Sequence, residues 1–396
     1  MTPSTTDSFS FDEEVDRRAV PALKVHPRVL GKDGGAVFAG SVADMDFRAP
    51  PVVLEALQVR LDHGVFGYEA VPNGLIPALT GWLETRHGWQ VADDHVLRAP
   101  NILNALAMAA SMFTDVGDGV IVQPPVFFDF FDILRENRRA LVRNPLILEG
   151  GRYRMDFDDL ERKAADPKAK MIYLCNPHNP VGRAWSADDL RQLGDICARH
   201  GVLVVADEIH GDVVFPGHRY TPFASLGPAY ADNCISCLSP AKSFNIASCC
   251  SAFTVIVHDE RRRAFQAENS RLTVNKNNAF ASVAMEAAYR HGGAWLDAVR
   301  AYLAENLDLV RERLRSVPNV ALIEPEGTFL LWLDFRALGL STDDLTAFLR
   351  NDAKWVVSRG QAFGEEGAGF ARMNIACPRS KLSSALDGLE RALAAR

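Results

Sequence analysis

Short apolar runs alternate with longer helical patterns through the middle of the chain, and this alternation constrains the fold more than any other feature. The runs are apolar almost throughout, which is typical of strands buried on both faces of a sheet: GVIVQ at 119–123, KMIYLC at 170–175, VLVVAD at 202–207, CISCL at 234–238 and FTVIV at 253–257. Between two of them a helix is predicted from a capping Ser186 to Gly201. The pattern predicts an α/β fold with a mostly parallel sheet sandwiched by helices.

The pattern changes after about residue 290 and indicates a smaller α+β domain. A long helix is predicted first, and strand-like runs and an amphipathic closing helix follow it: 295–317, then 328–335, 354–358 and 370–376, then a helix with Leu382, Leu386, Leu389 and Leu393 on one stripe. We expect a large domain at 48–290 and a small domain at 291–396. Residues 1–47 are poor in strands and are expected to form an arm that packs on the small domain or across a subunit interface.

Charge and hydropathy exclude several classes of protein. The 43 basic and 50 acidic side chains give a net charge of −7, which argues against a nucleic-acid surface. No apolar run approaches the roughly 18–20 residues needed to span a bilayer. The first residues, MTPSTTDSFSFDEE, lack the basic start and apolar core of a secretion signal. We therefore expect a cytoplasmic protein that binds neither nucleic acid nor membrane.

The seven cysteines do not form a disulfide framework. Cys234-x-x-Cys237 has a spacing that occurs in zinc and redox sites, but no second pair or histidine cluster stands at ligand spacing. Both cysteines lie in the apolar run CISCLSP, where a free cysteine acts as a small core residue. The core interpretation is favoured, and no metal is expected.

Three predicted strands are each followed by a polar motif. NPHNPVG (176–182) follows KMIYLC, DEIH (207–210) begins at the end of VLVVAD, and SPAKSFN (239–245) follows CISCL. Open α/β sheets bind their ligands at the carboxyl ends of the strands, so these motifs predict a ligand site. Taken singly, each has a plain structural explanation: a turn, a helix cap at Asp207 and a solvated surface charge at Lys242.

The chemistry of the last two motifs favours a cofactor. Asp207 at the end of a buried strand is costly to bury unless it meets a cation or a strong donor, and the protonated ring nitrogen of a bound cofactor would be such a partner. Lys242 in a partly desolvated pocket would have a lowered pKa, which would make it a usable nucleophile and base.

Together the three motifs resemble the fold-type I pyridoxal-phosphate (PLP) enzymes of the class I/II aminotransferase family. In that family an NPxNPxG loop, a strand-end aspartate and an S-x-x-K Schiff-base lysine occur in this order. The resemblance extends from about residue 10 to the end of the chain. It implies a PLP cofactor, a seven-stranded sheet in the large domain, a small amino acid as substrate and a homodimer with shared active sites.

Shorter motifs resemble the MalY/PatB-type C–S β-lyases, a branch that includes cystathionine β-lyases and cysteine desulfhydrases: VADMDF (42–47), HGVFGYE (63–69), QPPVF (123–127), DEIH (207–210), FGEEG (363–367) and CPRSKL (377–382). Ordinary aminotransferases of the family usually have DE-x-Y where this chain has DEIH. The resemblance favours β-elimination from cystathionine, cysteine or another S-substituted L-cysteine. An aminotransferase is the alternative, and a regulatory role that docks a transcription factor is a third hypothesis.

The resemblance assigns five residues to the cofactor ring. Lys242 would hold PLP as a Schiff base and act as the catalytic base. Asp207 would pair with the pyridinium nitrogen, and Asn179 would bind the 3′-oxygen and lie against the substrate. His210 replaces a tyrosine that donates to the same oxygen, and a neutral imidazole could also donate there. Phe127 would stack on the ring.

The remaining assignments concern the phosphate and the substrate. Ser239 and the backbone N–H groups of Ile102 and Leu103 would hold the phosphate at the start of a helix predicted over 103–113. Tyr68, also assigned as catalytic, would reach the phosphate of the neighbouring subunit. Arg372 would grip the substrate α-carboxylate, a bidentate contact that lysine cannot copy.

The chain also departs from the family pattern. Phe127 replaces the usual stacking tyrosine, and Asn101 stands where a serine or glycine is frequent. Cys249 and Cys250 lie where many aminotransferases have a phosphate-binding arginine. The phenylalanine-rich segment 127–134 is expected either to form core or to shape an apolar substrate pocket.

Overall fold

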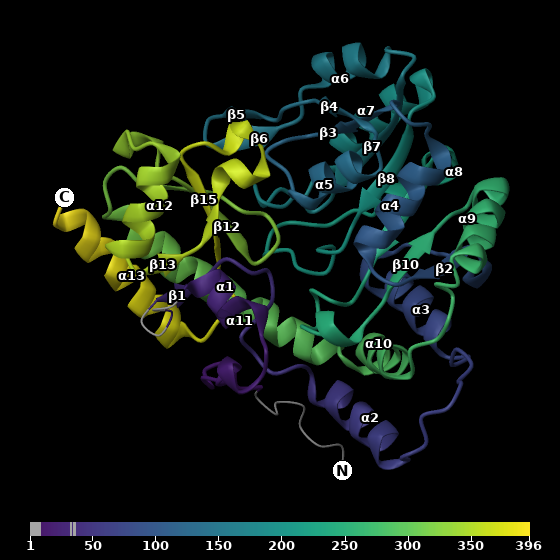
Figure 1. Ribbon diagram of the computed structural model, residues 1–396, viewed down its shortest axis with the longest axis horizontal. Coiled ribbons are helices and arrows are strands. Elements are labelled where there is room, and N and C mark those ends of the chain that lie inside the picture. The colour runs from purple at the N-terminus through teal and green to yellow at the C-terminus, as the bar shows by residue number, and fades with distance from the viewer. Residues whose placement is uncertain (1–8, 32–33, 35–36) are drawn as a thin grey trace.

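A sheet of seven strands forms the centre of the larger part of the molecule, in the computed structural model that describes residues 9–31, 34 and 37–396 (Figure 1). In spatial order the strands are β2 (Val96–Ala99), β10 (Ala252–Val255), β9 (Cys234–Leu238), β8 (Leu203–Asp207), β7 (Ala169–Cys175), β3 (Gly119–Val122) and β4 (Ala140–Arg143). β10 is antiparallel to both neighbours, and the other neighbouring pairs are parallel. The expected α/β class and mostly parallel sheet are confirmed.

Both faces of this sheet are buried. In β7, Met171 and Tyr173 belong to the core under one set of helices, whereas Ile172 and Leu174 belong to the core on the other face. The first set comprises α4 (Ile102–Phe113), α5 (Asp129–Glu136) and α9 (Asp259–Arg271), and the second includes α6 (Phe157–Ala164), α7 (Ala187–His200) and α8 (Pro228–Asp232). Burial on both faces explains why the central strands are apolar throughout.

The predicted helix between β7 and β8 is confirmed as α7. Ser186 and Asp189 form a reciprocal capping box at its start, and Gly201 ends it at a φ of 66°. α4 begins at Ile102, one residue before the predicted start, because the Asn101 side chain caps it by accepting from the N–H of Asn104 at 2.8 Å.

A second, antiparallel sheet lies in the C-terminal part of the chain. Its strands in spatial order are β11 (Ala321–Ile323), β12 (Leu330–Asp334), β15 (Phe370–Asn374) and β14 (Ser358–Arg359). The helices of this region are α11 (Gly293–Arg315), α12 (Thr342–Asn351) and α13 (Arg379–Ala394). In α13, Leu382, Leu386 and Leu389 are buried and Leu393 is half-buried, as the predicted stripe requires.

The strand predicted at 354–358 is divided in two. β13 (Trp355–Val356) pairs in parallel with β1 (Phe38–Ala39), whereas β14 pairs with β15. One continuous strand was wrong because the chain changes partner at Val357. The remaining elements are α1 (Pro27–Leu30), α2 (Pro51–Asp62), α3 (Leu75–His87), α10 (Ala279–His291) and the hairpin β5 (Ile147–Glu149) and β6 (Arg152–Arg154).

The described part of the N-terminal arm contacts the C-terminal region. Besides the β1–β13 pairing, Phe11 packs against Trp295 and Tyr302 of α11, with ring centroids 5.8 and 5.4 Å away. Residues 1–8 of the expected arm lie outside the described residues. The boundaries at 47/48 and 290/291 stay a prediction.

Cys234 and Cys237 are both free and buried, and they belong to cores on opposite faces of the large sheet. Strand geometry places residues three apart on opposite faces, so the two thiols cannot share a ligand. No group of His, Cys, Asp or Glu suited to a metal occurs among the described residues. Within the same part of the chain, no helix combines the length and the apolar character of a bilayer-spanning segment.

Candidate active site

The three motifs singled out in the sequence come together at one edge of the large sheet. The strand register pairs Cys175 with Asp207 and Asp207 with Cys237, so β7, β8 and β9 end side by side. NPHNPVG, DEIH and SPAKSFN therefore begin at neighbouring positions. The structure therefore brings the three motifs together at the carboxyl edge of the sheet, as expected.

The C-terminal region meets this edge through the NPHNPVG loop. The backbone N–H of Glu326 donates to the carbonyl of Gly182 at 2.7 Å, and Arg183 Nε donates to the Glu326 carboxylate at 2.9 Å. Gly182 has a φ of 73°, and a Cβ there would lie 2.8 Å from Pro325 Cβ, so the close approach requires glycine. This junction brings β15 to the ends of the large-domain strands.

Arg372 on β15 projects into the junction. Its Nη1 donates to Asn179 Oδ1 at 3.0 Å, and its Nη2 donates to the carbonyl of Ser41 at 2.7 Å and to Ser358 Oγ at 3.2 Å. The guanidinium lies 4.8 Å from the ring centroid of Phe363. Asn179 and Arg372, which the sequence analysis assigned to neighbouring tasks, are thus in direct contact.

The positive charge of Arg372 is buried without a carboxylate. The residue is 3% exposed, its Nε has no hydrogen-bond partner, and none of its contacts within the described residues is acidic. Burial lowers the pKa of Arg372 to about 9. A buried cation with an unused N–H donor is suited to bind a ligand carboxylate.

Lys242 lies in the turn that follows β9. Its Nζ donates to the carbonyl of Ala43 at 2.6 Å. Burial lowers the pKa of the ammonium group and the charge of Arg372 lowers it further, whereas Asp44 and Asp207 oppose the shift. The amine is therefore easier to deprotonate than an ordinary lysine, as a nucleophile or base requires.

Asp207 and His210 flank the same space from the loop after β8. Asp207 is buried and accepts only a 3.2 Å hydrogen bond from the N–H of Ile209 within the described residues. Burial raises the pKa of Asp207 to about 6, although Lys242 and the Ile209 N–H oppose the shift. Burial, Lys242 and Arg372 lower the pKa of His210, whose Nδ1 has no partner. The imidazole is therefore neutral at pH 7.

The residues assigned to the phosphate lie at the same edge. Ile102 and Leu103 open α4, and the first N–H groups of a helix have no intrahelical acceptor. Ser239 Oγ donates to the carbonyl of Ser251 at 2.8 Å and accepts from the N–H of Ala241 at 3.3 Å. The Ser239 hydroxyl thus serves its own loop, and a phosphate contact would require it to rotate.

The phenylalanine-rich segment contributes to both the core and the site wall. Phe130 is fully buried, whereas Phe127 and Phe128 are half-buried. The ring of Phe128 lies 5.7 Å from that of Phe363, which itself covers Arg372. The two alternatives offered for this segment therefore both apply, to different residues.

Tyr68 lies outside the site of its own chain. It is fully exposed in the segment between α2 and α3, which extends away from the rest of the molecule (Figure 1). Large apolar side chains are exposed around it: Leu54, Val59, Leu61, Val65 and Phe66. This placement leaves the assignment of Tyr68 to a neighbouring subunit as a prediction.

Sequence reasoning missed a strap formed by residues 41–47, which crosses the site. Asn374 Nδ2 donates to the carbonyls of two strap residues at 2.7 and 2.6 Å. Asn245 Oδ1 accepts from the N–H of Met45 at 2.9 Å. The motif VADMDF marked this segment but not its contacts, because most of them are to backbone atoms.

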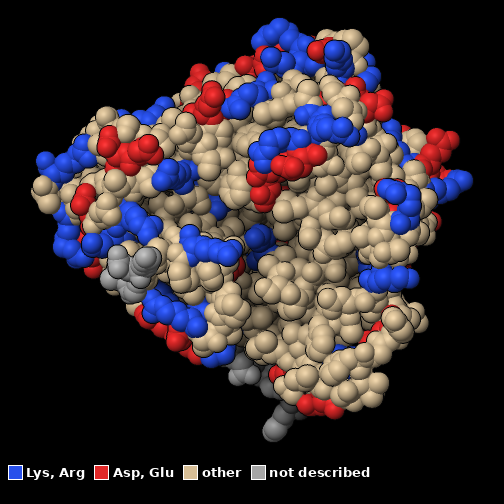
Figure 2. All heavy atoms as spheres, viewed as in Figure 1, with Lys and Arg blue, Asp and Glu red and all other residues tan. Residues whose placement is uncertain are grey.

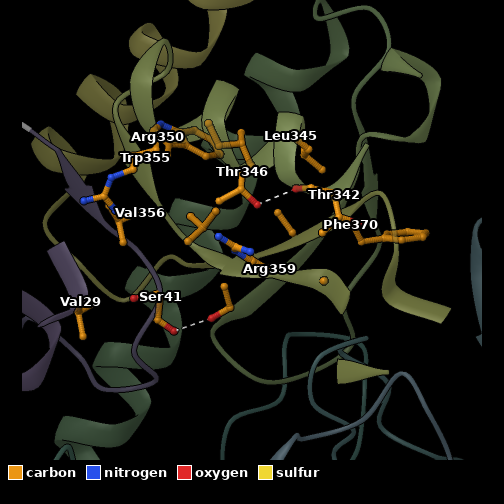
Figure 3. Close-up of a pocket in the computed structure, with 15 residues that line it drawn as sticks. Val29, Ser41, Thr342, Leu345, Thr346, Arg350, Trp355, Val356, Arg359 and Phe370 are labelled. Carbon is orange, nitrogen blue, oxygen red and sulfur yellow. Dashed lines mark hydrogen bonds between the residues drawn. The ribbon is translucent and has the colours of Figure 1, made fainter. Parts of the chain in front are cut away.

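A cavity of about 290 Å³ lies beside the site, between the N-terminal segment and the C-terminal region. Figure 3 shows Arg350 and Arg359 at this cavity and the hydrogen bond from Ser358 Oγ to the Ser41 carbonyl. Ser41 and Ser358 also contact Arg372, so they form the wall between the cavity and the site. None of the sequence-predicted site residues lines this cavity. Figure 2 shows a hollow near the centre of the surface with basic side chains inside it.

The orphaned polar groups fit pyridoxal phosphate and an amino acid. A protonated pyridine nitrogen would neutralise the buried carboxylate of Asp207, and an aldehyde would react with the Lys242 amine. An α-carboxylate would meet the free donor of Arg372. The carboxylate of Asp207 and the free Nε donor of Arg372 would therefore each gain a partner from this pair of ligands.

Comparison with known proteins identifies the class to which this fold and site belong. The family described as aminotransferase class I and II matches residues 41–389, and the chain belongs to this family. Its relatives include cystathionine β-lyase PatB of Bacillus subtilis (strain 168), which is 44% identical over 89% of this chain and 91% of the relative. Protein MalY of Escherichia coli (strain K12) is 34% identical over 98% of this chain and 99% of that protein.

A solved structure places the fold in the same group. The PLP-bound C–S lyase from Staphylococcus hominis superposes with a TM-score of 0.90 at 30% identity, covering 98% of this chain and 99% of that one. The fold class and the resemblance to C–S lyases that the sequence predicted are thereby confirmed.

Proposed function

We propose that this protein is a PLP-dependent C–S β-lyase. It would cleave cystathionine, cysteine or another S-substituted L-cysteine to a thiol, pyruvate and ammonia. The observation that carries the proposal is the meeting of three charged residues at one sheet edge. In the described part of the chain, Asp207 and Arg372 are buried with no group of opposite charge among their hydrogen-bond partners, and Lys242 is half-buried with only a backbone carbonyl as partner. The relatives named as cystathionine β-lyases support the reaction type.

Each residue would have a defined task. Arg372 would bind the substrate α-carboxylate with its planar donors, and Asn179 would fix the guanidinium from the other side. Lys242, with its lowered pKa, would take the proton from the substrate Cα. Bound PLP supplies an electron sink, and Asp207 would keep its ring nitrogen protonated. The thiolate would then leave Cβ and take up a proton, and the released aminoacrylate would react with water to give pyruvate and ammonia.

The aminotransferase alternative begins with the same proton removal and differs in the next step. Lys242 would then return the proton to the cofactor instead of allowing the thiolate to leave. The relatives favour the lyase. The positions of the site residues give no support to the third hypothesis, a regulatory role that docks a transcription factor. The cytoplasmic location stays a prediction.

We further propose a homodimer in which Tyr68 completes the site of the partner subunit. The exposed apolar residues of α2 and of the segment after it support this arrangement. Figure 2 shows that the surface over α2 and α10 is mostly uncharged. A second copy of the chain would cover this apolar surface, since monomers rarely leave large apolar patches in contact with water.

The test is an assay without a keto acid. The PLP-loaded protein is incubated with L-cystathionine, and pyruvate and free thiol are measured, with Lys242→Ala as the matched control. The lyase should form both products in equal amounts over many turnovers, and the control should form neither. Amino transfer to an added keto acid, without pyruvate or thiol from cystathionine, would contradict the proposal and favour the alternative.

A further inference from the structure

A partly buried hydrogen-bond cluster connects to the turn that carries Lys242. The Asp212 carboxylate accepts from Trp82 Nε1 at 2.9 Å, from His87 Nε2 at 2.8 Å and from Ser243 Oγ at 2.6 Å. Trp82 and His87 lie on α3, and Ser243 directly follows Lys242. The cluster therefore connects α3, the loop after β8 and the Lys242 turn.

The carboxylate of Asp212 is ionised although its side chain is only 12% exposed. Burial alone would raise its pKa, but the hydrogen bonds from His87, Ser243 and Trp82 bring the pKa below its ordinary value. A hydrogen bond from a hydroxyl to a carboxylate is stronger than one between neutral groups. The hydrogen bond from Ser243 to Asp212 thus restrains the backbone next to Lys242.

Close packing restrains the same cluster. Phe244 is fully buried, and its ring centroid lies 5.5 Å from that of Trp82. A Cβ at Gly211 would lie 2.7 Å from the ring of Tyr220, which packs edge-on against His87 at 5.0 Å. A side chain at position 211 would therefore collide with Tyr220, and Phe244, two residues after Lys242, is held among buried aromatic rings.

The side chain of Lys242 does not fix the position of its own backbone. Its Nζ has one hydrogen bond, to the carbonyl of Ala43, and this bond must be given up when the amine reacts. The backbone from which Nζ reaches must then be held by the neighbouring residues. Ser243 is the adjacent residue with a buried, charge-assisted hydrogen bond.

We propose that Asp212 is a positioning residue for Lys242. By holding Ser243, it fixes the backbone from which the amine reaches both the cofactor and the substrate Cα proton. Asp207, the proposed partner of the cofactor ring, lies only five residues earlier in the same segment. The inference rests on the proposed role of Lys242 and adds a residue that does not touch substrate or cofactor.

The first test removes only the Ser243 hydroxyl. Ser243→Ala is compared with Ser282→Ala. Ser282, on α10, is also buried, and its Oγ donates to Asn277 Oδ1 at 2.6 Å, whereas the one hydrogen bond of Lys242 Nζ among the described residues goes to Ala43. Ser243→Ala should lower kcat at least about 10-fold and leave KM within about 3-fold, because a misplaced reacting group slows the chemical step. It should also shift the pH midpoint of the visible absorption of bound PLP, whereas Ser282→Ala should change neither.

The second test asks whether Asp212 acts through Ser243. Asp212→Asn cannot accept from all three donors and should reproduce the loss of kcat and the shift of the absorption midpoint. The double variant should be no worse than Asp212→Asn alone, because the two residues form one unit. If Asp212→Asn does not fold, Ser243→Ala still decides the matter.

A purely structural role would give a different result. Ser243→Ala would then lower the melting temperature as Ser282→Ala does, with kcat and the absorption midpoint unchanged, and the inference would be overturned. The absorption titration needs only PLP and no substrate. A protein that bound PLP but cleaved no thioether would therefore refute the proposed lyase activity without refuting the role of Asp212.

Discussion

Replacing Asp207 by asparagine should stabilise the cofactor-free protein at neutral pH while weakening its hold on PLP. Burial raises the pKa of Asp207 to about 6 from an ordinary value of 3.8. Between these two values the folded protein retains a proton that the unfolded chain has lost. The stability from this proton is fully present below the unfolded pKa and is lost as the pH rises through the folded pKa.

The magnitude comes from that difference in pKa. A difference of about 2 pH units corresponds to about 3 kcal/mol, which is the cost of the ionised carboxylate to the cofactor-free protein above pH 6. Asparagine removes the charge and keeps an oxygen to accept the Ile209 N–H. With an unfolding entropy of about 2 cal/mol/K per residue, 3 kcal/mol raises the melting temperature of a chain this long by about 4 °C.

The assay is thermal unfolding of cofactor-free wild type and Asp207→Asn at several pH values. The variant should gain about 4 °C at pH 8, and the gain should disappear toward pH 4. Asp212→Asn is the matched control with the opposite sign, because hydrogen bonds keep the pKa of that buried carboxyl low. With PLP present, Asp207→Asn should lose the cofactor faster on dialysis. An Asp207→Asn protein that gains no stability at pH 8 would refute the reasoning.

Two further predictions concern the substrate and the dimer. Arg372→Ala should lower kcat/KM by at least about 30-fold, because truncating a buried charge-assisted contact costs about 2–5 kcal/mol. Decarboxylated analogues such as cysteamine thioethers should not be affected, and equal losses for both substrate sets would contradict the assignment. Mixing Tyr68→Phe with Lys242→Ala subunits should restore activity above both parents, because a mixed dimer has one site without either lesion. Subunit exchange without recovery would assign Tyr68 to its own chain.

The central strands could be predicted from the sequence because their burial leaves a clear pattern. β7, β8 and β9 are buried on both faces and read as continuous apolar runs. β4 is an edge strand with two exposed residues, and β2 is short and half-buried, so neither stood out from its surroundings. A strand that is only partly buried carries too little apolar signal to separate it from a loop.

The charged residues of the candidate site could be predicted from the sequence, because a charge is costly to bury and its position beside an apolar strand therefore stands out. Asp207 and Lys242 were found because a charged residue at the end of an apolar strand needs a reason to be there. The carbonyls of Ser41 and Ala43 were not predictable, since a backbone acceptor has no signature in the sequence. The contact between Asp212 and Ser243 was missed for another reason, because two ordinary polar residues become a pair only once the fold brings them together.

The buried charges of the site also indicate what a substrate must carry. Burial lowers the pKa of Arg372 and of Lys242 and raises that of Asp207, so each group is held in an environment that disfavours its charge. A ligand that supplies the opposite charge relieves this cost and gains differential affinity for the assembled site. For Arg372 that ligand group is a carboxylate, and for Asp207 it is a protonated ring nitrogen. Arg372 lies on β15 and Asp207 at the end of β8, so these two proposed contacts come from different sheets. Because Phe128 and Phe363 form the adjoining wall, the leaving group would meet an aromatic surface. The site therefore requires a free α-carboxylate of its substrate far more strictly than it requires one particular thiol.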